Sequence, residues 1–207
     1  MAWPVTLSDG PGGLRQLRRR DSARWAELRA ANRRWLEPWE ATPPDPRVPG
    51  LPFAQLVRSL TREARAGRAL PFAITYEGEM VGQLSVSGIG WGSLCSGHIG
   101  YWVSQHVAGR GIAPTAVALA TDHCLLTLGL HRIEVNIRPE NAASLRVVAK
   151  LGLRDEGVRA RYLHIDGAWR DHRTFAVTRE EIGDGGLLER WHHYHATGTA
   201  GAPEPRP

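Results

Sequence analysis

Cysteine, lysine and long apolar runs are scarce in this sequence of 207 residues, and each shortage excludes a class of protein. Two cysteines, Cys95 and Cys124, cannot build a disulfide framework, nor a zinc site from cysteine alone. No run approaches the roughly 20 apolar residues that span a bilayer, and the N-terminus lacks the pattern of a secretory signal. The nine histidines show no metal-ligand spacing. We therefore expect a reduced, cytoplasmic protein with no metal and no membrane association.

Lysine is almost absent, although the chain is basic. Lys150 is the only lysine among the 26 Lys and Arg residues, and the formal net charge is +5. Arginine can grip phosphate with two parallel hydrogen bonds, but the codon usage of a GC-rich genome explains the same excess. The scattered arginines favour the second explanation, since only Arg18-Arg19-Arg20 forms a run. No basic motif interleaved with aromatic residues is present, so we expect no direct nucleic-acid role.

The length and the hydrophobic content of 42% predict one globular domain with a sizeable core. Gly and Pro are frequent at the N-terminus, and the last residues, GTAGAPEPRP, have no core-forming pattern. We therefore expect a flexible N-terminus over residues 1–12, a domain over residues 13–180, and a partly disordered tail over residues 181–207.

Strand and helix patterns alternate within this domain. Strands are predicted over residues 14–19, 70–76, 80–87, 96–104, 131–137, 154–164 and 169–177. Helices are predicted after Asp21, which caps the first of them, and over residues 53–66, 114–128 and 141–151. This order predicts a single α/β domain with a mixed sheet and about four helices.

A glycine-rich turn connects a predicted strand to a helix at Gly109-Arg110-Gly111-Ile112-Ala113-Pro114. Small residues let a ligand approach the backbone closely, and Pro114 suits a first helical turn. The consecutive N–H groups from Gly109 to Ala113 would point at one spot at the positive end of the helix dipole, which suits a pyrophosphate. The turn has neither the spacing of a dinucleotide fingerprint nor that of a P-loop, and an ordinary structural turn has the same composition.

A second motif, Asn141-Ala142-Ala143-Ser144, opens the helix that ends near Gly152. One interpretation is a capping pair, because Asn141 is a good N-cap residue and Ser144 lies on the first turn. The other interpretation is functional: Asn141 fixes an amide of a bound ligand, and Ser144 offers a hydroxyl proton. The residues alone leave both open.

Together the two motifs resemble the GNAT N-acetyltransferase superfamily. Its acetyl-CoA signature is Gln/Arg-x-x-Gly-x-Gly/Ala, and the matching run here is Ala108–Ala113, which departs from the pattern at Ala108. Three stretches, 32–39, 99–103 and 163–172, resemble the RimJ/RimL-type ribosomal-protein alanine and serine N-acetyltransferases. The last stretch, taken with Asn141-x-x-Ser144, is most similar to the RimJ branch.

The resemblance implies a sheet in which two neighbouring strands splay apart and acetyl-CoA enters the gap. The residues implied in cofactor binding are Trp102, Val103, Gly109, Arg110, Gly111, Ile112, Ala113, Asn141 and Ser144. Pantetheine would pair with the main chain of Trp102 and Val103. Val103 N–H would stabilise the oxyanion, and Ser144 would protonate the leaving thiolate. Other branches carry a tyrosine one turn later, where this sequence has Val148.

The base of the reaction is less well defined. Glu134 lies in the middle of a predicted strand and is a candidate, but an ion pair with an arginine accounts for it equally well. An α-amine has a pKa near 8, so about a tenth of it is neutral at pH 7, whereas a lysine amine is almost wholly charged. The chemistry therefore favours an α-amine acceptor.

The acceptor mouth is expected between the first helices and the last hairpin. Its candidate residues are Trp35, Glu37, Trp39, Tyr162 and Asp171, of which the two carboxylates would hold the cationic amine. The expected activity is transfer of an acetyl group from acetyl-CoA to a protein N-terminus, with a ribosomal protein as the candidate partner. The alternatives are acetylation of a small amine, such as an antibiotic or polyamine, and a non-catalytic acyl-CoA-binding protein.

Overall fold

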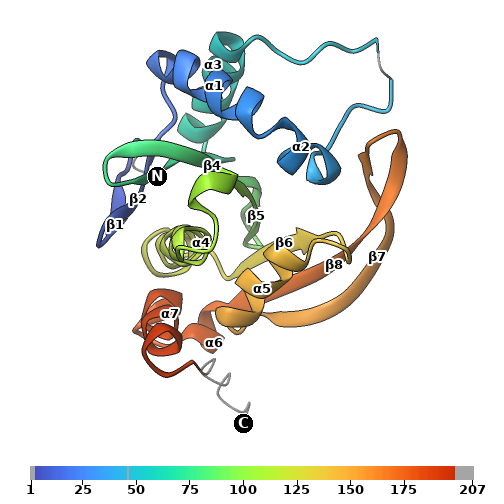
Figure 1. The fold of residues 1–207 in the computed structure, drawn as a ribbon. Helices are drawn as coiled ribbons and strands as arrows, with labels where there is room; N and C mark the ends of the chain where they lie inside the picture. The colour runs from blue at the N-terminus through green and yellow to red at the C-terminus, as the bar shows by residue number, and fades with distance from the viewer. Residues whose placement is uncertain (1–2, 46, 199–207) are drawn as a thin grey trace.

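One open sheet runs through the molecule (Figure 1). The computed structural model describes residues 3–45 and 47–198. Within these residues, eight strands pair in the order β1-β2-β3-β4-β5-β6-β8-β7. They are β1 (Leu7–Asp9), β2 (Gly12–Gln16), β3 (Leu70–Tyr76), β4 (Glu79–Gly90), β5 (Ser96–Val103), β6 (Arg132–Ile137), β7 (Arg154–Ile165) and β8 (Ala168–Thr178). The β5–β6 pair is parallel and the other pairs are antiparallel, which confirms the predicted mixed sheet.

Helices cover both faces of this sheet. They are α1 (Ser22–Ala31), α2 (Arg33–Leu36), α3 (Phe53–Arg65), α4 (Ile112–Asp122), α5 (Ala142–Lys150), α6 (Arg179–Ile182) and α7 (Gly186–Thr197). The four predicted helices correspond to α1, α3, α4 and α5. The first predicted helix is interrupted at Asn32, which separates α1 from α2. A π-helical turn over His123–Thr127 extends α4. No helix among the described residues is long and apolar enough to cross a membrane.

The side chains of β3 show how the two faces are filled. Leu70, Phe72 and Ile74 point into the large core that α4, α5 and α7 cover. Ala73 faces the smaller core beneath α1 and α3. Successive strand residues point to opposite faces, so a strand that is apolar at both sets of positions is covered on both sides.

The predicted splay lies between β5 and β6. Their parallel ladder has only three residue pairs, which end at His98 and Glu134. Beyond that point, β6 continues against β8 through Ile137, whereas β5 continues against β4 through Val103. The second half of β5 therefore has a free edge, because its neighbour on that side has diverged.

The N-terminal segment differs from the expected flexible arm. Leu7–Asp9 forms β1 and pairs with Gly12–Leu14 of β2. This strand is only three residues long, and the glycines and prolines around it hide any period-two pattern. Residues 1–2 lie outside the described residues.

The C-terminal segment expected to be a tail contains α7. Leu187 and Trp191 are buried in the large core, and Asp122 of α4 accepts hydrogen bonds from the N–H groups of Leu187 and Leu188 at 2.7 and 2.9 Å. The folded unit therefore extends beyond residue 180 to about the end of α7. Residues 199–207 lie outside the described residues, so the expected disorder there stays a prediction.

Candidate active site

A cleft of about 560 Å³ opens where β5 and β6 diverge. Its walls come from β5, the start of α4, the start of α5 and the turn η2 (Glu37–Trp39). Ten predicted site residues line it: Trp35, Trp39, Trp102, Val103, Gly109, Gly111, Ile112, Ala113, Asn141 and Ser144. All the predicted cofactor residues except Arg110 thus meet in one place with two of the predicted acceptor residues.

The glycine-rich turn forms one end of the cleft. Gly109 and Gly111 have φ angles of +84° and +81°, a region that side-chain-bearing residues rarely adopt. The first backbone hydrogen bond of α4 runs from Thr115 N–H to Gly111 O at 3.1 Å. Within the described residues, no hydrogen bond uses the N–H groups of residues 109–113. These free donors at a helix start fit the diphosphate of a coenzyme A nucleotide.

The tail helix α7 supports this turn from outside. A β-carbon at Gly111 would lie 2.9 Å from Cζ2 of Trp191, so the ring packs directly on the glycine. The ammonium of Lys150 lies 5.8 Å from the Trp191 ring and also lines the cleft. Sequence reasoning missed Trp191 because it treated the segment as a tail. Arg110, which was predicted to bind cofactor, is exposed and lies outside the cleft lining.

The free edge of β5 presents main-chain groups to the cleft. Ser104 N–H donates to Val81 O of β4 at 2.8 Å. Because peptide groups point to alternate sides along a strand, those of Trp102 also face β4, and those of Val103 and Tyr101 face the gap. This corrects the expectation that Trp102 offers its main chain to a pantetheine.

Val103 is the last residue of β5, so its main-chain groups lie at the end of this free edge. Trp35 Nε1 donates to Val103 O at 3.2 Å, which satisfies the carbonyl. The Val103 N–H points to the same side of the strand, and no hydrogen bond outside the strand ladders uses it in the described residues. A single unpaired donor therefore remains there, as an oxyanion site requires.

The helix cap and the Ser144 hydroxyl are separate features at the start of α5. Asn141 Oδ1 accepts a hydrogen bond from the main-chain N–H of Ser144 at 3.0 Å. The capping interpretation is therefore correct for Asn141 and for the backbone of Ser144. The Ser144 hydroxyl takes no part in the cap, and its residue lines the cleft.

Tyr101 brings a second hydroxyl to Ser144. Its Oη atom is buried and forms no hydrogen bond of standard geometry in the described residues. Burial raises the pKa of the Tyr101 phenol to about 12, and the adjacent Ser144 side chain opposes this shift. The phenol is therefore protonated and able to donate at neutral pH. The sequence pointed to Val148 as the position where related branches carry tyrosine, and gave no signal for a tyrosine from β5.

A buried polar network holds the loop between β5 and α4. Asn32 Nδ2 donates to Ser104 Oγ at 2.7 Å, and Asn32 Oδ1 accepts from Gln105 N–H at 2.8 Å. Ser104 Oγ also lies 2.7 Å from His106 Nδ1. Asn32 is the residue that interrupts the first predicted helix. The interruption places its side-chain amide against the loop that leads to the glycine-rich turn, which we call the cradle (residues 109–113).

Arginines hold the part of the cleft wall that η2 and Glu40 form. Arg138 Nη1 donates to Pro38 O at 2.7 Å, and its guanidinium lies 5.5 Å from the centre of the Trp39 ring. Arg29 forms an ion pair with Glu40, a carboxylate that lines the cleft. Neither Arg138 nor Glu40 was a sequence candidate.

Glu134 does not line the cleft, and the ion-pair alternative is correct. Its oxygens accept from Arg132 Nε at 2.9 Å and Arg159 Nη2 at 2.8 Å, and His98 Nδ1 lies 3.2 Å away. Burial alone would raise the pKa of Glu134, but the hydrogen bond and charge of Arg132 and the charge of Arg159 outweigh it and lower the pKa below its usual value. A carboxylate held in this way is a poor proton acceptor, which corrects its assignment as the base.

Three predicted acceptor residues also lie outside the cleft lining. Glu37 is exposed on η2. Tyr162 stacks with the guanidinium of Arg159 at 5.1 Å and accepts a hydrogen bond from it. Asp171 accepts from the main-chain N–H of Arg161, whose φ angle is +50°. The two residues of the last hairpin therefore have structural partners of their own.

A valine at Gly109 is expected to weaken acetyl-CoA binding at least about 10-fold. Valine strongly disfavours the left-handed conformation, so the turn must change and its N–H groups no longer converge. Gly92→Val is the matched control, because Gly92 has a φ of +83°, equally open surroundings, and a place in a distant turn. Calorimetry on both folded variants makes the comparison, and equal affinities would contradict the prediction that the N–H groups of this turn bind the diphosphate of acetyl-CoA. Gly111 is unsuitable, because a side chain there meets Trp191.

Glu134→Gln is expected to leave turnover within about threefold of wild type and to lower the free energy of unfolding by about 1–3 kcal/mol. The pKa of Glu134 is depressed in the folded state. Its stabilisation is therefore present above the unfolded pKa and is lost as pH falls through the folded value. Urea unfolding between about pH 6 and 3 should show a steeper loss for wild type than for the variant. A hundredfold loss of turnover at unchanged stability would restore Glu134 as the base.

No group of three or more His, Cys, Asp or Glu residues in the described part of the chain is arranged to hold a metal ion.

Residues 13–154 match the model of the acetyltransferase (GNAT) domain family. The chain is 31% identical over 167 residues to the [ribosomal protein uS5]-alanine N-acetyltransferase of Escherichia coli (strain K12), covering 80% of this chain and 86% of that protein.

Solved structures agree with this match. The Mycobacterium smegmatis RimJ in complex with CoA-disulfide superposes with a TM-score of 0.83 at 41% identity, covering 97% of this chain and 98% of that chain. The ribosomal-protein-S5-alanine acetyltransferase from Vibrio fischeri gives a TM-score of 0.77 at 26% identity, covering 86% and 98%. Members of the GNAT family take their acetyl group from acetyl-CoA, for which the splayed edge and the glycine-rich cradle are suited. The chain belongs to the GNAT family of N-acetyltransferases.

Proposed function

We propose that this enzyme transfers an acetyl group from acetyl-CoA to the α-amine of a protein N-terminus, with a ribosomal protein as acceptor. The observation that carries the proposal is the agreement over nearly the whole chain with the Mycobacterium smegmatis RimJ structure. The E. coli relative, by its name, acetylates an alanine of ribosomal protein uS5. The proposal places the enzyme in the cytoplasm, where ribosomal proteins are made.

Two donors would serve the acyl transfer. Bound acetyl-CoA supplies the thioester that the amine attacks. Val103 N–H, unpaired at the free edge of β5, would donate to the oxyanion that forms. The Ser144 hydroxyl, which the cap leaves free, would give a proton to the thiolate that leaves. The buried Tyr101 phenol beside Ser144 would supply a further donor.

The shortage of free carboxylates in the cleft favours an α-amine as acceptor. Glu40 is paired with Arg29. A main-chain hydrogen bond, with the charge of Arg138 at 3.2 Å, lowers the pKa of the Glu140 carboxyl. Because an α-amine has a pKa near 8, a useful fraction is neutral without a strong base. A lysine amine needs a base to lose its proton, and no unpaired carboxylate of the described residues lines this cleft to serve as one.

Trp35 and Trp39 would form the wall against which the acceptor peptide lies. Both line the cleft, and hydrogen bonds or ring contacts hold both in place. Glu37, on the same turn as Trp39, remains the candidate for holding the charged amine at the rim. Asp171 is a weaker candidate, since its carboxylate already holds Arg161 N–H.

Ser144→Ala is expected to lower turnover by about 10²-fold with little change in acetyl-CoA affinity. Alanine keeps the main-chain N–H that Asn141 caps, so the helix should stay intact. Steady-state kinetics of thiol release, with calorimetry for the affinity, provide the measurement. Turnover at the wild-type rate would show that the hydroxyl does not act on the thiolate.

The acceptor is tested with a panel of peptides that begin with Ala, Ser or Thr, peptides with an internal lysine, aminoglycosides and polyamines. We expect kcat/KM to be highest for an N-terminal peptide, since a useful fraction of an α-amine is neutral without a strong base, whereas a lysine amine is almost wholly charged. Peptides with a blocked N-terminus are the control and should be inert. Higher efficiency with a drug or a polyamine would contradict the proposal and support the small-amine alternative.

A further inference from the structure

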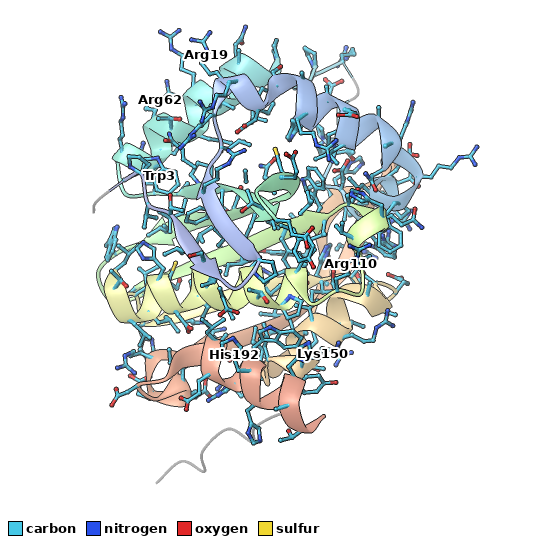
Figure 2. All side chains as sticks on the ribbon, turned by 60° about the vertical axis from the view of Figure 1, so that its left-hand side comes forward. Trp3, Arg19, Arg62, Arg110, Lys150 and His192 are labelled. Atoms are coloured by element: carbon cyan, nitrogen blue, oxygen red, sulfur yellow. The ribbon has the colours of Figure 1, made fainter. Side chains whose placement is uncertain are left out.

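Six arginines line a groove of about 740 Å³ between the N-terminal turn and α3. The arginines are Arg18, Arg19 and Arg20, the last two on η1 (Arg19–Asp21), together with Arg58, Arg62 and Arg65 on α3. Figure 2 shows Arg19 and Arg62 pointing outward from this end of the molecule, whereas Arg110 and Lys150 lie in another region. The groove is therefore separate from the cleft, and its lining shares no residue with it.

The arrangement comes from two segments that are far apart in the sequence. Arg58, Arg62 and Arg65 follow the i, i+4, i+7 spacing of one helix face, whereas Val57 and Ala64 of the same helix are buried. The run at residues 18–20 faces this row across the groove. Two rows of guanidinium groups thus border an open channel.

Acidic residues near the groove already have other partners. Asp21 is held by both Nη atoms of Arg15, at 2.8 and 2.9 Å. Glu63 accepts from Arg68 at 2.7 Å and lies 3.8 Å from Arg62. In the described part of the chain, Arg19, Arg20, Arg58 and Arg65 make no salt bridge, and all four are exposed. The groove therefore keeps a concentrated positive charge, which suits a polyanion.

The sequence has no basic motif interleaved with aromatic residues and predicts no direct nucleic-acid role, but the tertiary structure gathers six arginines in this groove. We infer that this groove binds the phosphate backbone of RNA. Guanidinium groups bind phosphate oxygens through paired hydrogen bonds, and two rows along a channel match the regular spacing of charge on a nucleic-acid strand. Among the described residues, no aromatic side chain lines the groove, so bases would not stack there and binding would depend little on sequence. The choice of RNA among polyanions rests on the proposed function, because a ribosomal acceptor is presented on an RNA-rich particle.

Such binding would raise the local concentration of the acceptor at the cleft. The groove and the cleft have separate linings, so an enzyme held by RNA at the groove keeps its acetyl-CoA site accessible. The effect should appear with acceptors on ribosomal particles and be absent with free peptides. Positive charge on η1 and α3 would then add to catalytic efficiency without touching the reacting atoms.

Fluorescence polarisation with a labelled 20-base-pair RNA duplex provides the direct test. Arg58→Ala combined with Arg65→Ala should raise Kd at least about fivefold and reduce the slope of log K against log salt by about 2. The matched control combines Arg33→Ala with Arg34→Ala, which removes the same charge from exposed helical positions outside the groove. The control should stay within about twofold of wild type. Equal losses in both double variants would overturn the assignment.

Two further measurements separate this inference from the proposed function. Polyglutamate of similar charge should compete poorly with the duplex, and competition at equal charge concentration would assign the groove to an acidic protein instead. Acetylation of a free N-terminal peptide should be unchanged in the Arg58/Arg65 double variant, whereas acetylation on purified ribosomal subunits should fall at least about fivefold. If the double variant loses RNA binding but acetylates subunits as wild type does, the docking role is overturned. If the wild-type enzyme acetylates no N-terminal peptide while RNA still binds at the groove, only the proposed function is overturned.

Discussion

The divergence of β5 from β6 after three residue pairs is the constraint on which the site depends. A parallel pair that stays together uses in its ladder the main-chain groups that face the neighbouring strand, and leaves no room for a ligand between its strands. Here β6 follows β8 and β5 follows β4, so the edge at Tyr101 and Val103 is left without a neighbour. The starts of α4 and α5 then meet at the gap, which places helix-terminal donors at the same opening.

Such a gap is useful only if its walls are held in place. Asn32 holds the loop after β5 through Ser104 and Gln105, and Trp35 occupies the Val103 carbonyl. On the other side, Trp191 packs against Gly111 at the turn that begins α4. The first helices and the last helix thus reach the same site from opposite ends of the chain. Preorganised donors of this kind need no rearrangement when charge develops in the reaction.

Arginine has two different roles in this basic chain. Around β6, Arg132 and Arg159 neutralise Glu134, and Arg132 together with Arg154 holds the pKa of Glu156 at about 2. These charged groups form ion pairs with one another. At η1 and α3 the arginines face solvent instead, and the nearby acids are already paired. Composition alone does not separate the two groups, since both contribute equally to the net charge.

Local chemistry in the sequence determined the strands β2 to β8, four of the helices, the glycine turn and the Asn141 cap, but not the short β1. Each depends on residue types a few positions apart, such as the apolar pattern of β3 or the left-handed positions of Gly109 and Gly111. Only the tertiary structure decided that Glu134 is an ion-pair residue, that Tyr101 meets Ser144, and that α7 supports the cradle. It also joined residues 18–20 to α3 in one groove. These contacts join residues far apart in the sequence, and strand register and helix docking, which no local pattern specifies, bring them together.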